Sequence, residues 1–589
     1  MNDKIKVMMV TEGTYPFHHG GVSTWSDILI KNLSKDIDFV MYSIIMNPFV
    51  TQKFSLPRNT ELIKVPLWGT EEPSEHLSIP FSKVYLSKKM TTDSVIKQQF
   101  LPLFLDFIEE IVSPYKNPER LGKTIYEMYK YFQVYEYKKS FKSEIVWDSY
   151  KQFILEFTRD KENKLEQPGI YSIIHSLGWI YRFMTILNTP MPKVDVTHSA
   201  AAAFCGIPCV ISKFENNTPF ILTEHGVYLR EQYLSLSQRG YSTFLNTFLM
   251  RLIHSVVNLN YFYADQVSPV CSYNTRWEER FGVSREKISV IYNGVDKNVF
   301  SPKILSFEKS SNPTVVSVAR IDPVKDIISL MRAAAIVKKE IPNVRFIVYG
   351  SVSVPTYFEE CKKEKEELSL GESFIFAGHS SDIPSAYRSG DVVALSSITE
   401  GFPYSVVEAM MSGKPVVATD VGGIKEALGD SGILVPARDA EALAKGISTL
   451  LNNPELRTSL SLEARERALN YFTIERVDDL YYESYAALAA KSKASEVEGK
   501  VISADEMFSR KRQLLLMEKG YALFENTFYE EAIKVLRSAV KEVPKSNAVP
   551  ILLTKIAEAY SALGEHELAL NEMEKAEVLI RLINMNKTA

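Results

Sequence analysis

The chain has 589 residues, which is too long for a single hydrophobic core, so two or three domains are expected. Its hydrophobic fraction of 46% and charged fraction of 24% are typical of a soluble globular protein. A formal net charge of only −4 predicts no electrostatic attraction to nucleic acid, which excludes a nucleic-acid-binding function.

No stretch of the sequence predicts export, a direct membrane span or a zinc site. The apolar run in residues 1–13 is too short for a signal peptide, and we expect it to be a first strand. The most apolar long window, residues 244–267, is interrupted by polar residues and falls short of the roughly 20 apolar residues of a membrane span. Four cysteines without zinc-type spacing indicate reduced thiols in a cytoplasmic protein: Cys205, Cys209, Cys271 and Cys361.

A glycine-containing loop, residues 14–26, follows the first strand and opens a helix that runs to Leu33. Gly20 and Gly21 have no side chains, so the backbone there can approach a ligand closely. Taken alone, the pair is better explained as a plain tight turn. Its place after the first strand makes both glycines candidate ligand-binding residues.

Residues 71–167 replace the alternation of strands and helices with helical patterns, and we expect a helical insertion there. The alternation resumes with a helix at 170–183 and strands near 194–199, 220–224 and 266–270. His225 follows the second of these strands in the string Thr-Glu-His-Gly-Val-Tyr. A lone histidine is usually structural, but one at the carboxyl end of a strand lies where α/β proteins bind ligands.

The C-terminal half alternates again, with strands at 314–318, 344–349 and 374–377 and helices at 327–339 and 356–368. Arg320 and Lys325 lie on the loop after the first of these strands, where two cations can hold a diphosphate from one side. Gly350 and His379 follow the next two strands. We predict that they contact the base and ribose of a nucleotide.

Two carboxylates flank a turn that leads into a helix, in the string Glu400-Gly-Phe-Pro-Tyr-Ser-Val-Val-Glu408. The helix is expected from Ser405 to the Gly413 region, so both carboxylates can face the crevice above a parallel sheet. Unpaired N–H groups at the helix start are a ready site for a phosphate oxygen. Glu408 could equally be an ordinary solvated residue. The residues between the two carboxylates that we predict to contact the ligand are Phe402, Pro403, Tyr404 and Ser405.

Beyond a helix at 474–490, the composition after Ser492 is typical of a linker, and residues 505–589 then repeat. Small and apolar residues at 520, 523, 532, 536 and 539 recur at a constant offset of 37. The pattern resembles a pair of tetratricopeptide repeats, which are all-α hairpins. Two repeats are fewer than the three or so that usually stand alone, so we expect them to dock on another surface.

Segments 315–326, 400–408 and 414–423 together resemble the retaining glycosyltransferases of family four. Their fold, GT-B, has two Rossmann-like doubly wound domains facing a crevice. The resemblance implies an N-terminal acceptor-side domain at 1–300 and a nucleotide-sugar-binding domain at 301–473. A helix at 474–491 is expected to cross back to the first domain.

The resemblance also implies a role for each matched residue. Arg320 and Lys325 would bind the donor diphosphate, Glu400 would lie beside the donor sugar, and Glu408 would bind the ribose. The Gly20-Gly21 loop would face the phosphates, and His225 would lie close to the sugar. No metal or other cofactor is implied, and Asp36-Ile-Asp, which spells the metal triplet of the GT-A fold, is interpreted as a solvated turn.

The string from Thr11 to Trp25 resembles one branch, the PelF glycosyltransferases of Pel exopolysaccharide synthesis. We therefore predict transfer of a hexosyl or N-acetylhexosaminyl unit from a UDP-sugar to an oligosaccharide or polysaccharide acceptor. The insertion is rich in aromatic residues, eleven among the 32 from Tyr126 to Phe157, which either stack on acceptor sugars or form the insertion's own core.

Two rival functions compete with this prediction. A phosphorylase of the same fold lacks support, because no pyridoxal-phosphate lysine motif is recognisable. The alternative is a catalytically weak or inactive scaffold that works through its repeats in a polysaccharide-synthesis complex. In either case residues 505–589 are expected to bind a protein partner of a membrane synthase complex, at the inner face of the cell membrane.

Overall fold

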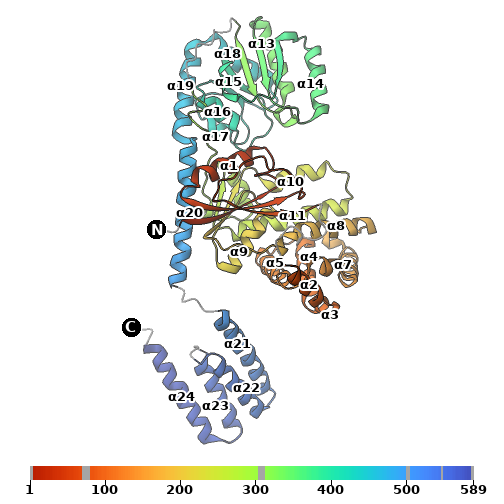
Figure 1. Cartoon of the computed structure of the whole chain (residues 1–589), viewed down its shortest axis with the longest axis vertical. Coiled ribbons are helices and arrows are strands. Elements are labelled where there is room, and N and C mark those ends of the chain that lie inside the picture. Colours follow the sequence, from red (N-terminus) through yellow and green to blue (C-terminus); the bar gives the residue numbers. More distant parts are fainter. Residues whose placement is uncertain (1–3, 69–79, 303–311, 499–503, 545–547, 586–589) are drawn as a thin grey trace. The chain divides into compact units, whose positions relative to one another are not determined.

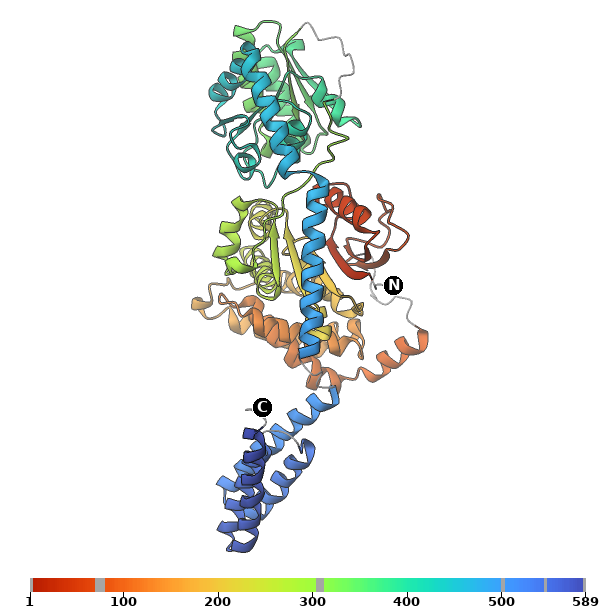
Figure 2. The same ribbon diagram turned by 90° about the vertical axis from the view of Figure 1, so that its left-hand side faces the viewer.

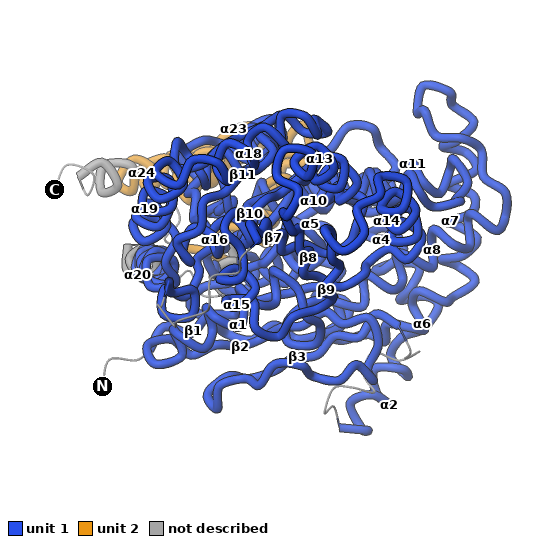
Figure 3. The backbone as a smooth tube through the Cα atoms, turned by 90° about the horizontal axis from the view of Figure 1, so that it is seen from above, with its two compact units in different colours: residues 1–492 blue, residues 493–589 orange. Residues whose placement is uncertain are grey.

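The computed structural model of the chain describes residues 4–68, 80–302, 312–498, 504–544 and 548–585. Two compact units are present, Met1–Ser492 and Lys493–Ala589, and each is described by itself (Figure 3). The first unit contains two six-stranded sheets flanked by helices, and the second contains helices (Figure 1). Within the described ranges, no helix combines the length and the apolar character needed to cross a bilayer.

All strands of the first sheet run parallel, in the order β3-β2-β1-β4-β5-β6. The strands are β1 (Ile5–Glu12), β2 (Ile37–Ile45), β3 (Glu61–Pro66), β4 (Val196–Ser199), β5 (Phe220–Glu224) and β6 (Gln266–Pro269). Alternate residues of β1 enter two different cores, Met8 on one face and Val7 and Met9 on the other. Both faces of β1 are therefore covered, which explains why its centre, Val7 to Val10, is a continuous apolar run. The helices next to the sheet are α1 (Gly21–Leu33), α9 (Ile207–Asn216), α10 (Tyr228–Ser237), α11 (Thr243–Tyr263) and α12 (Ser272–Arg280).

The second sheet is also parallel, in the order β12-β11-β10-β7-β8-β9. Its strands are β7 (Thr314–Val318), β8 (Arg345–Tyr349), β9 (Phe374–Gly378), β10 (Val392–Leu395), β11 (Val416–Thr419) and β12 (Ile433–Val435). The strand order reverses between β7 and β10, and this switch point is where doubly wound sheets bind ligands. The helices of this domain are α13 (Ile327–Glu340), α14 (Pro355–Glu367), α15 (Ile383–Arg388), α16 (Tyr404–Met411), α17 (Ile424–Leu428), α18 (Ala440–Asn452) and α19 (Pro454–Tyr471).

A helical segment separates β3 from β4. It comprises α2 (Phe81–Met90), α3 (Asp93–Val95), a π-helical turn (Ile96–Phe100), α4 (Leu101–Val112), α5 (Pro118–Phe132), α6 (Tyr137–Phe141), α7 (Glu144–Phe157) and α8 (Ile170–Phe183). Of the eleven aromatic residues between Tyr126 and Phe157, six are buried and five half-buried. The buried ones pack on one another, for example Phe132 on Phe141 with ring centroids 5.7 Å apart. Most of this aromatic content therefore forms the core of the segment itself.

Helix α20 (Ile474–Glu498) runs alongside the first sheet's domain (Figure 2). Tyr481 and Tyr485 are fully buried there, and their hydroxyls lie 2.9 Å from Thr223 Oγ1 and 2.6 Å from His198 Nδ1. The helix continues to Glu498, past the linker predicted after Ser492. The reason is that Lys, Ser, Glu and Ala, which suggested a linker, also suit a solvated helix.

The second unit consists of two helix–turn–helix pairs, α21 (Ala504–Glu525) with α22 (Tyr529–Glu542) and α23 (Val549–Ala562) with α24 (His566–Met585). The small residues of the predicted repeat lie where helices meet. A Cβ added at Gly520 would lie 2.5 Å from the Leu536 side chain, and Ala557 is 2% exposed. The assignment as tetratricopeptide repeats stays a prediction.

Candidate active site

A cavity of about 370 Å³ lies at the carboxyl ends of β7 to β10, beside the switch point of the second sheet. The loops after β7 and β10, which are far apart in the sequence, both contribute to its wall. Ten of the thirteen predicted site residues line it: Arg320, Lys325, Gly350, His379, Glu400, Phe402, Pro403, Tyr404, Ser405 and Glu408.

Lys325 and Glu400 form an ion pair on the cavity wall. Lys325 ends a short 3₁₀ turn, Pro323–Lys325, whose N-cap Asp322 accepts a hydrogen bond from Val324 N. Its Nζ donates to Glu400 Oε1, which also accepts a 2.6 Å hydrogen bond from the Ser397 hydroxyl. Both charged side chains keep a little exposure, 18% and 11%, so a ligand in the cavity can reach them.

Arg320 brings a second positive charge to the same wall. Among the described residues, Arg320 forms no ion pair. The salt bridges of this domain join other side chains, such as Lys325 with Glu400 and Arg332 with Glu364. An unneutralised guanidinium beside a partly exposed ammonium favours a ligand with several anionic oxygens.

Glu408 is held by a buried tyrosine on the neighbouring helix α15. The Tyr387 hydroxyl donates to Glu408 Oε2 at 2.8 Å and lies 3.1 Å from the Ser405 carbonyl oxygen. Burial raises the pKa of Glu408 to about 7, and the hydrogen bond from Tyr387 opposes that rise. Glu408 is thus a half-buried, oriented carboxyl group that lines the cavity, and the interpretation as an ordinary solvated helix residue is wrong.

The first turn of α16 also faces the cavity. Pro403 is its N-cap and supplies no side-chain hydrogen bond, so the turn begins without a capping side chain. Tyr404 is the first helical residue, one before the predicted Ser405. The N–H groups of such a turn attract an anionic oxygen.

A glycine turn after β11 fixes the loop that carries Glu400. Gly422 has a φ of 58°, and a Cβ added there would lie 1.7 Å from the Glu400 carbonyl oxygen. Gly423 N donates to the Gly401 carbonyl oxygen at 2.8 Å. Only glycine permits this approach and this backbone conformation together. The signal was present in the sequence as the Val-Gly-Gly string, whereas the roles of Tyr387 and Ser397 carried no such signal.

His225 does not line the cavity but borders the loop that does. A Cβ added at Gly401 would lie 2.6 Å from the His225 carbonyl oxygen. The imidazole packs edge-on against Trp25 with centroids 4.6 Å apart, and its Nε2 is buried without a hydrogen-bond partner among the described residues. Burial lowers the pKa of His225 to about 3, so the ring is neutral at physiological pH.

Gly20 and Gly21 differ in what the structure places near them. A Cβ added at Gly21 would lie 3.8 Å from Tyr404 Cε2, so this glycine faces the first turn of α16. Gly20 has an extended backbone and no atom within 4 Å of an added Cβ. The structure thus places Gly21 next to a cavity-lining residue, while Gly20 is not among the residues that line the cavity.

No group of three or more His, Cys, Asp or Glu side chains that could hold a metal ion occurs in the part of the chain that the structure describes. The triplet Asp36-Ile37-Asp38 lies at the start of β2, with Asp36 exposed and Asp38 accepting a 3.0 Å hydrogen bond from Asn59.

Comparison with protein families divides the chain into two parts. Residues 303–467 match the family model described as "Glycosyl transferases group 1", and residues 5–286 match a "Domain of unknown function". A trehalose synthase of Pyrococcus horikoshii is 32% identical over 178 residues, which are 29% of this chain and 42% of that protein. A D-inositol 3-phosphate glycosyltransferase of Salinispora arenicola is 30% identical over 242 residues, 36% of this chain and 53% of that protein. The chain thus spans about half the length of the curated relatives it matches.

Two solved structures share the architecture of most of the chain. Sucrose-phosphate synthase of Thermosynechococcus elongatus has a TM-score of 0.53 at 17% identity, covering 83% of this chain and all of that one. HepE of Anabaena in complex with UDP has a TM-score of 0.52 at 16% identity, covering 82% of this chain and all of that one. At these identities the likeness shows the fold alone. The predicted GT-B fold is therefore confirmed, and the C-terminal domain is similar in sequence to group 1 glycosyltransferases over residues 303–467.

Proposed function

We propose that this protein is a retaining glycosyltransferase that transfers a hexosyl or N-acetylhexosaminyl unit from a UDP-sugar to a growing, Pel-like exopolysaccharide. The observation that carries the proposal is the 370 Å³ cavity, where two cations, two carboxylates and a helix N-terminus converge. A UDP-sugar has complementary parts: a diphosphate, a ribose with paired hydroxyls, and a hexose. HepE, which shares the fold, has been solved with UDP-glucose, and this supports uracil as the base.

The diphosphate would be held by Arg320, Lys325 and the first N–H groups of α16. As the glycosidic bond lengthens, negative charge builds up on the leaving phosphate, and preorganised donors stabilise that charge. In this proposal the two cations and the helix end supply the positive charge, so no metal is required.

The carboxylates would act on the two ends of the donor. Glu408, oriented by Tyr387, would accept hydrogen bonds from the ribose hydroxyls, while Glu400 would lie beside the hexose. The acceptor hydroxyl would attack the anomeric carbon on the face that the phosphate leaves. The leaving phosphate oxygen would take the acceptor proton, so the anomeric configuration is retained. His225, whose backbone borders Gly401, would lie close to the sugar.

The second unit would dock on a protein partner of a membrane synthase complex, which would bring the enzyme to the inner face of the cell membrane. Large apolar side chains on its surface support a docking role. They include Ile551, Leu568, Leu570 and Met573, with exposed fractions between 40% and 65%.

The experiment that tests the function is a donor panel. The purified chain is incubated with UDP-, GDP- and ADP-sugars, and hydrolysis and transfer are followed by NMR, which also reports the anomeric configuration. UDP-sugars should be consumed with retention of the anomeric configuration. The rate of donor consumption by the Arg320→Gln variant gives the background. Consumption equal to that background, or an inverted product, would contradict the proposal.

A further inference from the structure

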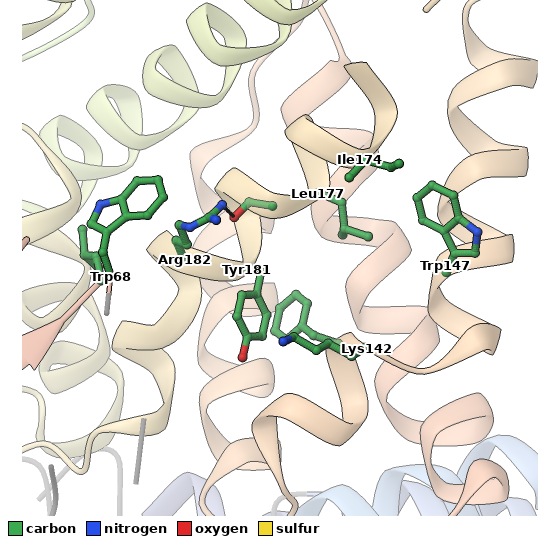
Figure 4. Close-up of a pocket in the computed structure, with 10 residues that line it drawn as sticks. Trp68, Lys142, Trp147, Ile174, Leu177, Tyr181 and Arg182 are labelled. Atoms are coloured by element: carbon green, nitrogen blue, oxygen red, sulfur yellow. Dashed lines mark hydrogen bonds between the residues drawn. The ribbon is translucent and has the colours of Figure 1, made fainter. Parts of the chain in front are cut away.

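A second cavity, of about 550 Å³, lies in the helical segment between β3 and β4, apart from the donor site (Figure 4). We propose that it binds sugar units of the acceptor chain, an inference that rests on the proposed function. Its walls come from the end of β3 and from α6, α7 and α8. The lining residues are Leu67, Trp68, Phe141, Lys142, Trp147, Ile174, Leu177, Gly178, Tyr181 and Arg182.

The wall combines flat aromatic rings with aliphatic side chains. Trp68, Trp147 and Tyr181 are all half-buried, so part of each ring stays open to a ligand (Figure 4). Ile174, which is 52% exposed, and Leu177 lie between them on α8. Other aromatic residues of this segment, such as Phe104 and Phe132, are buried in its core, whereas these three rings face a cavity. Flat, partly exposed rings suit the apolar faces of sugar rings.

Every charged side chain in the lining is a cation. The Arg182 guanidinium lies 4.0 Å above the centre of the Trp68 ring, and Lys142 Nζ lies 5.2 Å from the centre of the Tyr181 ring. No acidic residue is among the lining residues. Lysine and arginine donate hydrogen bonds and accept none, so the occupant must be rich in acceptor oxygens. Rings paired with donors therefore favour a glycan over a purely apolar or a cationic ligand.

The cavity lies at the carboxyl edge of the first sheet, the edge at which β1 leads into the loop with Gly21 and β5 leads into His225. Trp68 follows the carboxyl end of β3. Two backbone hydrogen bonds of 2.9 Å hold this segment to the end of β2: Leu67 N donates to the Ile45 carbonyl oxygen, and Trp68 N donates to the Met46 carbonyl oxygen. The edge strand β3 is two strands from β1, a lateral distance of about 10 Å. An acceptor chain held here could therefore extend toward the crevice.

Packed aromatic rings connect the cavity to the core below the carboxyl end of β1. Centroid steps of 5.4, 5.6 and 3.8 Å lead from Trp68 through Trp179 and Phe183 to Phe204. The next residue, Cys205, donates its N–H to the Glu12 carboxylate at the carboxyl end of β1 at 3.3 Å. The cavity is thus connected by packed side chains to the strand that opens the glycine loop.

The test measures glycan binding to the full chain in the absence of nucleotide. Cellohexaose, chitohexaose and hexagalacturonic acid are titrated by calorimetry against the unmodified protein, Trp147→Ala and Lys142→Ala. We expect at least one hexasaccharide to bind, about tenfold more weakly to Trp147→Ala and about threefold more weakly to Lys142→Ala. Tyr171→Ala is the matched control, because Tyr171 is an exposed aromatic of α8 that stacks on His175 outside the cavity lining.

The outcomes separate this inference from the proposed function. Binding of UDP is measured on the same samples and should be unchanged in all three variants. If no hexasaccharide binds, or if the cavity variants bind as the control does, the inference is overturned even where UDP-sugar turnover is seen. Because Lys142 is exposed, its substitution tests the cavity without disturbing the core.

Discussion

Replacing each of the two carboxylates of the donor cavity by glutamine should impair different steps, UDP binding for Glu408 and turnover for Glu400. Glu408 would contact the ribose already in the ground state, so Glu408→Gln should weaken the binding of UDP. Loss of a hydrogen bond to a charged group costs about 1.5–3 kcal/mol, which corresponds to about 10- to 150-fold in Kd. The measurement belongs at about pH 8, because burial raises the pKa of Glu408 to about 7 and the carboxylate must be ionised.

Glu400→Gln should instead lower kcat. Its carboxylate would act as charge develops at the anomeric carbon, and loss of one such group costs about 10²–10³ in rate. The structure adds a second expectation: Glu400 neutralises Lys325, so its replacement frees that ammonium. UDP affinity should therefore stay within about threefold of the unmodified value or become slightly tighter.

Calorimetry with UDP and initial rates with a UDP-sugar check both expectations. Glu372→Gln is the control, because Glu372 is an exposed carboxylate of the same domain outside the cavity. If Glu400→Gln and Glu408→Gln bind UDP as this control does and turn over normally, the two carboxylates take no part in the site and the reasoning is refuted.

Three further predictions address charge, domain organisation and pH. Lys325→Ala should lower kcat by about 10²–10³ while Tm changes little, since Glu400 keeps its hydrogen bond from Ser397; an unchanged kcat would remove Lys325 from the site. A chain ending at Ser495 should fold and hydrolyse donor slowly but lose partner binding or polymer synthesis, whereas insolubility would make the second unit part of the core. Burial raises the pKa values of the adjacent carboxyl groups of Glu224 and Glu278, so their stabilising contribution is greatest in acid and is lost as pH rises through the folded-state values. Tm should therefore fall less for Glu278→Gln than for the unmodified chain between about pH 6 and about pH 9, and equal declines would show that the pair does not titrate there.

Much of the fold was predictable because local patterns determine it. Continuous apolar runs such as Val392–Leu395 indicate strands buried on both faces, and the alternation of strands with helices predicts parallel doubly wound sheets. Polar loops after such strands meet at one edge, so Arg320 and Glu400 could be placed in one crevice from the sequence alone. The resemblance carried by the same loops then implied the family of the C-terminal domain.

Other features depended on contacts between residues far apart in the chain, and no local pattern encodes such contacts. The Tyr387 hydroxyl on Glu408 and the tyrosines of α20 beside Thr223 are set by how helices pack. Whether an aromatic residue is core or cavity wall is likewise a matter of tertiary packing: Phe132 is buried, whereas Trp147 lines an open cavity. The sequence by itself determined the two sheets and the residues at their carboxyl edges. Only the tertiary structure decided which of those side chains are held, charged and open to a ligand, because burial and partners are properties of the packed molecule.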